Sequence, residues 1–247
     1  MGILEIVLPV AVSFVITVIA GKLLIPALVR LKAGQSIKEI GPTWHMSKQG
    51  TPTMGGLMFI AAVAIVVLVL NGPAILSGDL TSVFVLLFAL VFGLIGFIDD
   101  YAKIKKKENA GLTPRQKLVL QILVAAVFIL VLFLESDGLP SLMVPFTGIS
   151  IDLPWPVYII FAAFVIVGAD NAVNLTDGID GLAASVTVPV AVFFAAVGAR
   201  IGNTGVTIFA GALAGGLLGF LIYNFNPAKV FMGDTGSLFL GGAVAGM

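Results

Sequence analysis

Residues 81–101 read TSVFVLLFALVFGLIGFIDDY, a largely apolar run over 81–98 that ends in Asp99 and Asp100. A run of this length matches the roughly 17–25 residues that cross a bilayer core of about 30 Å. A carboxylate at membrane depth costs roughly 2.5–3.5 kcal/mol on insertion scales, so it usually needs a cation, a metal or a substrate as its partner. The stretch therefore predicts a transmembrane helix whose end carries a functional acidic pair.

The rest of the chain repeats this pattern. Of its 247 residues, 59% are hydrophobic and only 11% are charged, whereas a soluble domain carries about 25% charged residues. Continuous rather than alternating apolar runs favour helices over a β-barrel; the other runs lie near 6–29, 55–70, 117–134, 155–169, 182–199 and 205–223, and an eighth begins near Leu238. We predict an all-α, polytopic integral membrane protein with seven complete transmembrane helices plus the start of an eighth.

The remaining composition narrows the function. The net charge is zero, so nothing indicates nucleic acid as a partner, and the absence of cysteine excludes a disulfide framework and thiol chemistry. Residues 135–156 are rich in proline and alternate in polarity over Met143–Leu153. This segment predicts a short hairpin on the outer surface.

The cationic residues predict the orientation. When the loops are taken alternately, one set holds eleven Lys and Arg residues and the other holds only Arg200. Cytoplasmic loops carry the excess of positive charge. The amino terminus is therefore expected outside, with loops 30–54, 99–116, 170–181 and 224–237 in the cytoplasm.

Three acidic motifs fall in these cytoplasmic loops: FIDDY at 97–101, NAVNLTDGIDG at 171–181 and FMGDTGS at 231–237. Neighbours on a helix point about 100° apart, so Asp99 and Asp100 are not expected to face one atom unless the helix end unwinds. They are expected instead to divide the roles of base and metal neighbour. The alternative for this pair is a solvated helix end answered by Lys103 and Lys107.

The second and third motifs suit an anionic ligand. Glycines beside Asp177 and Asp180 let a ligand approach the backbone at a helix start, where amides favour anions. Capping by Asp180 alone is the alternative, but it leaves the other polar residues of the same loop unexplained: Asp170, Asn171 and Asn174. Asp234 lies in a glycine-rich turn that suits Mg²⁺ and phosphate, and a capped turn is the alternative there.

The segment His45–Gly56 adds a lysine, Lys48, and a threonine, Thr53, before a glycine pair. The lone His45 is not expected to build a zinc site without cysteines, and Lys48 suits either phosphate binding or topology. Metal, cations and carboxylates together favour phosphoryl transfer. The chain lacks a Gly-x-x-x-x-Gly-Lys-Ser/Thr loop, so ATP hydrolysis is not indicated.

These motifs resemble those of the phospho-N-acetylmuramoyl-pentapeptide transferase (MraY) family in the polyprenyl-phosphate N-acetylhexosamine-1-phosphate transferase superfamily. The aspartate motifs indicate the superfamily, while KQGTPTMGG at 48–56 and NAVNLTDG at 171–178 favour this branch. The resemblance implies a Mg²⁺-dependent reaction in which undecaprenyl phosphate attacks UDP-MurNAc-pentapeptide, releasing UMP and forming lipid I. It also implies a bacterial inner membrane enzyme with its active site on the cytoplasmic face.

The resemblance also assigns roles by motif. Asp234 would be the metal ligand, and Asp99 and Asp100 the catalytic pair. The uridine-diphosphate portion of the substrate would be surrounded by Lys48, Thr53, Lys103, Asn174, Asp177, Gly178, Ile179, Asp180, Asn224 and Phe231. Direct deprotonation of the lipid phosphate by Asp99 and a covalent carboxylate intermediate are both open.

The family has ten transmembrane helices and a histidine-rich cytoplasmic loop before the last. We therefore expect residues 1–247 to form a single transmembrane catalytic domain with the C-terminal part of the family fold missing. The expected partners are the two substrates and the lipid bilayer, with a homodimer as a candidate assembly. Competing functions are a sibling transferase that uses another UDP-sugar and an ion-coupled transporter, whose site would instead lie near the bilayer midplane.

Overall fold

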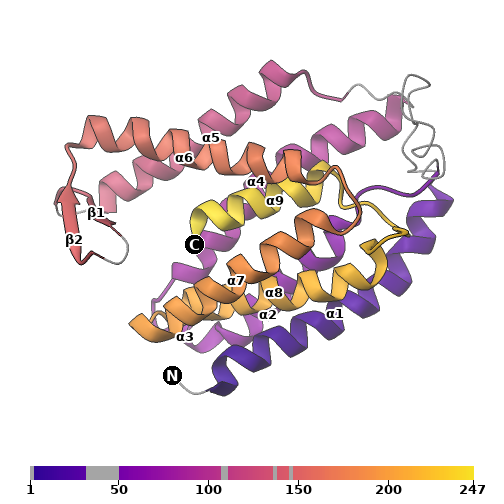
Figure 1. The fold of residues 1–247 in the computed structure, drawn as a ribbon, viewed down its shortest axis with the longest axis horizontal. Coiled ribbons are helices and arrows are strands. Elements are labelled where there is room, and N and C mark those ends of the chain that lie inside the picture. The colour runs from indigo at the N-terminus through magenta and orange to yellow at the C-terminus, as the bar shows by residue number, and fades with distance from the viewer. Residues whose placement is uncertain (1–2, 32–49, 107–110, 136–137, 145–146) are drawn as a thin grey trace.

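The computed structural model describes residues 3–31, 50–106, 111–135, 138–144 and 147–247. They form a bundle of helices with one two-stranded hairpin at its end (Figure 1). In chain order the elements are α1 (Ile3–Arg30), α2 (Gly56–Leu70), α3 (Gly72–Leu76), α4 (Thr81–Lys106), α5 (Pro114–Glu135), β1 (Ser141–Val144), β2 (Ile149–Asp152), α6 (Trp155–Thr176), α7 (Leu182–Ile201), α8 (Thr204–Asn224) and α9 (Gly233–Gly246).

Six of the described helices are long and apolar enough to cross a membrane: α1, α4, α5, α6, α7 and α8. This confirms a polytopic membrane protein. The one remaining predicted span, 55–70, corresponds to α2. Its 15 residues fall short of the ~17 that a membrane crossing needs. Asn71 interrupts the apolar run at this point, and Gly72 and Pro73 form the first turn of the short helix α3.

The predicted hairpin is present as antiparallel β1 and β2, and Figure 1 shows it at the far end of α5 and α6. Leu142 pairs with Ile151 and Val144 with Ile149. Cross-strand partners share a face, so one face of the hairpin is wholly apolar.

Three helices extend beyond their apolar runs, which corrects the predicted loops. Helix α4 continues through Asp99 and Asp100 to Lys106, α6 continues through Asp170 and Asn174 to Thr176, and α9 already begins at Gly233. The polar residues stay helical because they find partners in the helix itself or in neighbouring helices. In α4, for example, Lys103 lies one turn after Asp99, 2.5 Å from its Oδ2.

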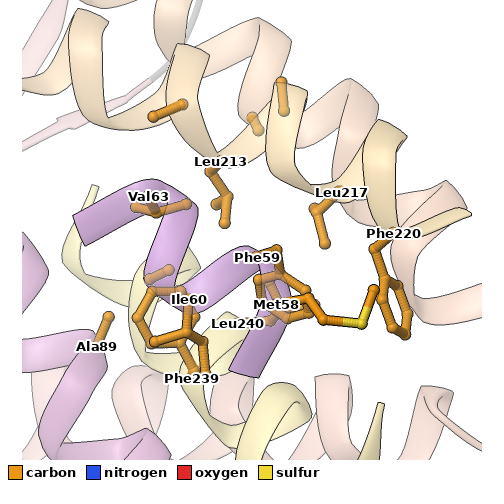
Figure 2. Packing of buried hydrophobic residues seen from close by; sticks show 14 of the residues in the cluster. Met58, Phe59, Ile60, Val63, Ala89, Leu213, Leu217, Phe220, Phe239 and Leu240 are labelled. Atoms are coloured by element: carbon orange, nitrogen blue, oxygen red, sulfur yellow. The ribbon is translucent and has the colours of Figure 1, made fainter. Parts of the chain in front are cut away.

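Helix α9 lies in the middle of the bundle, packed between α4 and α6 on one side and in contact with α2 and α7 on another (Figure 1). Phe239 of α9 lies near Phe59 of α2, whose ring packs edge-on against Phe220 of α8 at a centroid distance of 5.5 Å (Figure 2). Lipid tails are as apolar as these side chains, so helix association in a membrane depends on close packing rather than on the hydrophobic effect. The centre of the bundle supplies such packing.

Glycines at four-residue spacing on α8, Gly211, Gly215 and Gly219, also pack closely, as small residues at membrane helix interfaces do. Gly215 and Gly219 lie against the backbone carbonyls of Val10 and Phe14 on α1, where an added Cβ would collide. The small-residue stripe is therefore a helix-packing face.

Candidate active site

The first turn of α9 packs closely against α4 on one side and against the start of α2 on the other. A Cβ at Gly96 of α4 would collide with the carbonyl of Asp234, and one at Gly56 would collide with the backbone of Gly236. The N–H groups of Gly55 and Gly56 donate to the carbonyls of Phe231 and Met232 at 2.9 Å each. Close backbone contact thus places Asp234 beside the end of α4.

Asp100 binds the beginning of α9. Its carboxylate accepts hydrogen bonds from the backbone N–H of Asp234 at 3.2 Å and from the N–H and hydroxyl of Thr235 at 2.9 and 2.7 Å. The first N–H groups of a helix have no partner within it and carry partial positive charge. Asp100 therefore caps α9 from a separate helix, and its side chain is buried.

Asp99 faces α5 instead. Its Oδ1 accepts a hydrogen bond from the Leu112 N–H at 2.6 Å, and its Oδ2 lies 2.5 Å from Lys103 Nζ and 3.6 Å from Lys117 Nζ. The two aspartates therefore have different hydrogen-bond partners. Even so, one oxygen of each lies within 4.8 Å of the other while α4 stays helical, so the expectation that the pair would not face one atom without unwinding is wrong.

Asp234 lies between the two helices that flank α9. Lys103 and Lys117 each donate to its Oδ2 at 2.8 Å, and the Asn174 side-chain amide of α6 donates to its Oδ1 at 2.9 Å. Burial by itself would raise the pKa of Asp234. Hydrogen bonding with Asp99 and the charges of both lysines outweigh burial and hold that pKa well below its usual range.

Three carboxylates meet here: one oxygen each of Asp99, Asp100 and Asp234 lie within 4.8 Å of one another. Hard oxygen donors of this kind suit Mg²⁺. The ammonium of Lys103 lies within 2.5–3.8 Å of oxygens from all three. The three carboxylates therefore already attract one cation to this point. The residues present fit a divalent cation.

The two loops assigned to the nucleotide lie side by side. Asn224 is buried; its Oδ1 accepts from the Gly181 N–H at 3.0 Å, and its Nδ2 donates to the Val230 carbonyl at 2.9 Å. Asp180 Oδ2 accepts from the Ala228 N–H at 3.2 Å. Asn224 and Asp180 therefore join the segments 177–181 and 225–231.

Asp177, Gly178 and Ile179 precede this junction. Burial, followed by the charges of Asp234 and Asp100, raises the pKa of Asp177 to about 8. Gly178 and Ile179 are exposed, so they leave an open surface next to the acidic cluster.

The remaining predicted residues divide between the site and undescribed segments. Thr53 lies next to the first residue of α9, because a Cβ on Gly233 would meet the Thr53 hydroxyl at 2.7 Å. Phe231 is half-buried, and its N–H donates to the Pro52 carbonyl at 2.8 Å. Lys48 and His45 lie outside the described residues.

Lys117 is the main site residue that sequence reasoning missed, since it counted there only toward the orientation. It opens α5, 17 residues beyond Asp100 in the chain, yet contacts Asp234 directly. A signal was available, because a lysine that begins an apolar run beside an acidic motif is a candidate partner for that motif. Its link to Asp234 depends on tertiary packing, which the sequence does not display.

The chain is similar to known proteins of one family. Residues 80–247 match the family model of glycosyl transferase family 4, and residues 48–60 match phospho-N-acetylmuramoyl-pentapeptide-transferase signature 1. The chain is 47% identical over 95% of its length to the phospho-N-acetylmuramoyl-pentapeptide-transferase of Listeria monocytogenes, of which it covers 72%. It is likewise 47% identical to that of Staphylococcus carnosus and 46% identical to that of Geobacillus kaustophilus, covering 73% of each. The chain therefore belongs to the phospho-N-acetylmuramoyl-pentapeptide-transferase family.

Proposed function

We infer that this chain transfers phospho-MurNAc-pentapeptide from UDP-MurNAc-pentapeptide to undecaprenyl phosphate, forming lipid I and UMP in peptidoglycan biosynthesis. Identity of 47% over 95% of the chain supports this reaction. The observation that carries it is the junction of α4, α5, α6 and α9, where three carboxylates and two lysines surround one point. Phosphoryl transfer needs this combination of cation-binding and cationic groups.

We assign the metal-binding role to Asp234, with Asp99 and Asp100 beside it. When bound, Mg²⁺ would neutralise diphosphate charge in the transition state. The Lys103 and Lys117 ammonium groups are placed to compensate phosphate charge as well, since both already pair with Asp234 Oδ2.

Asp99 is our candidate for the proton acceptor. Its Oδ2 would take the proton of the lipid phosphate, whose oxygen then forms a bond to the β-phosphorus of the nucleotide as the bond to UMP breaks. A general base must be within hydrogen-bond reach of its proton. A covalent route through a carboxylate remains the alternative, and Asp100 is less suited to it because both its oxygens bind the start of α9.

The UDP portion would lie over the joined loops, among Lys48, Thr53, Asn174, Asp177, Gly178, Ile179, Asp180, Asn224 and Phe231. Asn224 and Asp180 support the shape of these loops through hydrogen bonds within the protein. Gly178 and Ile179 are more exposed. We propose that these two contact the nucleotide and that Asn224 acts through the loops.

We also propose that the protein spans the bacterial plasma membrane with its amino terminus outside and the site on the cytoplasmic face. Helix α2 together with α3 would complete the seventh crossing. This orientation is supported by the lysines gathered at the same end of the bundle as the carboxylates, including Lys103 and Lys117. A homodimer is part of the same proposal.

The test is formation of lipid I and UMP from UDP-MurNAc-pentapeptide and undecaprenyl phosphate by the detergent-solubilised protein with Mg²⁺. UDP-N-acetylglucosamine serves as the competing substrate. Turnover with the MurNAc-pentapeptide donor alone supports the proposal, while turnover with UDP-N-acetylglucosamine alone would replace it with the sibling transferase.

A further inference from the structure

A second polar network lies one helical turn away from the acidic cluster, between α5 and α6. Gln121 and Asp170 are both fully buried, and Gln121 Nε2 donates to Asp170 Oδ2 at 2.6 Å. The Asn171 side-chain amide in turn donates to Gln121 Oε1 at 2.8 Å. Adjacent residues of α6 thus hold both ends of one amide of α5, which fixes its position and its orientation.

This network is connected to Asp234 through two helices. Lys117 precedes Gln121 by one turn of α5, and Asn174 follows Asp170 by one turn of α6, so each pair lies on one helix face. Lys117 contacts Oδ2 of Asp234 and Asn174 contacts Oδ1. The contacts form a closed ring: the Gln121–Asp170 bond sets the spacing of α5 and α6, and the two helices deliver one donor to each oxygen.

Helix α9 closes the arrangement from the third side. A Cβ at Gly241 would collide with the backbone and Oδ1 of Asp170. Gly241 follows Asp234 by seven residues, about two turns, and so lies on the same face of α9. Asp170 is therefore held against the helix that carries Asp234.

Stability alone does not account for this network. A carboxylate at membrane depth costs roughly 2.5–3.5 kcal/mol, whereas a hydrogen bond between transmembrane helices contributes about 0.6 kcal/mol on average. Among the described residues, Asp170 Oδ1 accepts no hydrogen bond. An apolar pair would pack α5 on α6 at a lower free-energy cost. It would not fix one relative position of the two helices, as a directional hydrogen bond does.

We propose that Gln121 and Asp170 are positioning residues that place Lys117 and Asn174 on the two oxygens of Asp234. The effect on turnover rests on the proposed function. The effect on Lys117 itself does not, because it follows from the geometry of the ring.

The experiment compares three variants with the wild type in detergent. Gln121→Met keeps the length and volume of the side chain but removes both hydrogen bonds. Asp170→Asn keeps an acceptor oxygen for Gln121. Ser82→Ala is the matched control, because it breaks a buried 2.7 Å hydrogen bond from Asn71 near the start of α4, at the opposite end of that helix from Asp99.

Two quantities are measured at equal folded fraction. In Gln121→Met, kcat should fall roughly 10- to 100-fold, the range expected for small misplacement of catalytic groups, while KM for the nucleotide sugar changes little. The rate at which an amine-reactive ester acylates Lys117, followed by peptide mass spectrometry, should rise severalfold because the lysine no longer pairs with Asp234. Asp170→Asn and Ser82→Ala should keep wild-type values of both.

Unchanged Lys117 acylation in Gln121→Met would overturn the proposal, and so would an Asp170→Asn variant as impaired as Gln121→Met, because charge rather than the acceptor would then matter. If the wild type forms no lipid I, the proposed function fails while the acylation comparison still decides the positioning role. Should Gln121→Met not fold, Gln121→Asn, one methylene shorter, serves the same comparison.

Discussion

Lys103 is the side chain on which the acidic cluster converges. Its ammonium lies 2.5 Å from Asp99, 2.8 Å from Asp234 and 3.8 Å from Asp100. Three carboxylates and the two lysines leave the cluster with a formal charge of −1 when all are ionised, from −3 and +2. A divalent cation would reverse that sign and make the same position attractive to a diphosphate.

At Asp234 the prediction concerns charge at constant size. Asp234→Asn removes the carboxylate shared by Lys103 and Lys117 and should lower turnover at least ~100-fold, in line with several kcal/mol of metal-based charge stabilisation. Asp152→Asn, an exposed change in the hairpin, is the control and should leave turnover unaltered. Near-normal turnover of Asp234→Asn at saturating Mg²⁺ would contradict the metal assignment.

Asp177 gives a prediction about pH. Its pKa is raised to about 8 in the folded protein, against ~3.9 in an unfolded chain. Between these values the folded state binds the extra proton, so this group's contribution to stability falls as pH rises from about 4 through 8. Asp177→Asn should match the wild-type Tm below about pH 4 and exceed it at pH 9, measured without Mg²⁺. Parallel Tm curves for the two proteins would contradict the raised pKa.

At this scale the acidic motifs at the ends of apolar runs mark Asp99, Asp100 and Asp234, which gather in the structure, but they mark Asp177 and Asp180 equally. The sequence does not predict their partners. Lys117 and Ser237 become neighbours of Asp234 and Asn174 only through packing of α5 and α9. The fixed bond from Gln121 to Asp170 joins positions 49 residues apart, for which the sequence carries no local signal.

Among the elements, the junction of α4 and α9 is the most tightly packed part of the site. Gly96→Ala would place a methyl group against the Asp234 carbonyl, where overpacking costs about 1–3 kcal/mol. The variant should lower both Tm and turnover. Gly168→Ala on α6, with nothing within 4 Å of the added Cβ, should be neutral or stabilising by helix propensity. Equal Tm values for the two variants would argue against this junction.

Helix positions are well predicted by apolar runs, and helix ends are not. The runs locate α1, α2 and α4–α8, but the ends of α4 and α6 and the start of α9 extend into polar sequence. Apolar runs indicate which residues lie in the lipid. The helix ends outside these runs are stabilised by ion pairs such as Asp99 with Lys103. The acidic residues therefore lie on helices rather than in loops, which holds them more rigidly.

For the whole molecule the prediction is orientation. The chain has no cysteine, so single cysteines report cleanly. In intact cells an impermeant maleimide should label Ser150→Cys in the hairpin and spare Arg115→Cys at the start of α5, because positive loops stay in the cytoplasm. Permeabilised cells supply the control, in which both positions react. Labelling of position 115 alone in intact cells would reverse the topology.

The central place of α9 has a consequence for biosynthesis. The ribosome makes α4, α5 and α6 before α9, and chains fold from the amino terminus as they emerge. Until residue 234 is translated, Lys103 and Lys117 lack the carboxylate of Asp234, and α6 packs on α5 without the helix that meets it at Asp170. Insertion of α9 between helices already in the membrane would thus complete the proposed active site, and we expect a stalled nascent chain that ends before α9 to be catalytically silent.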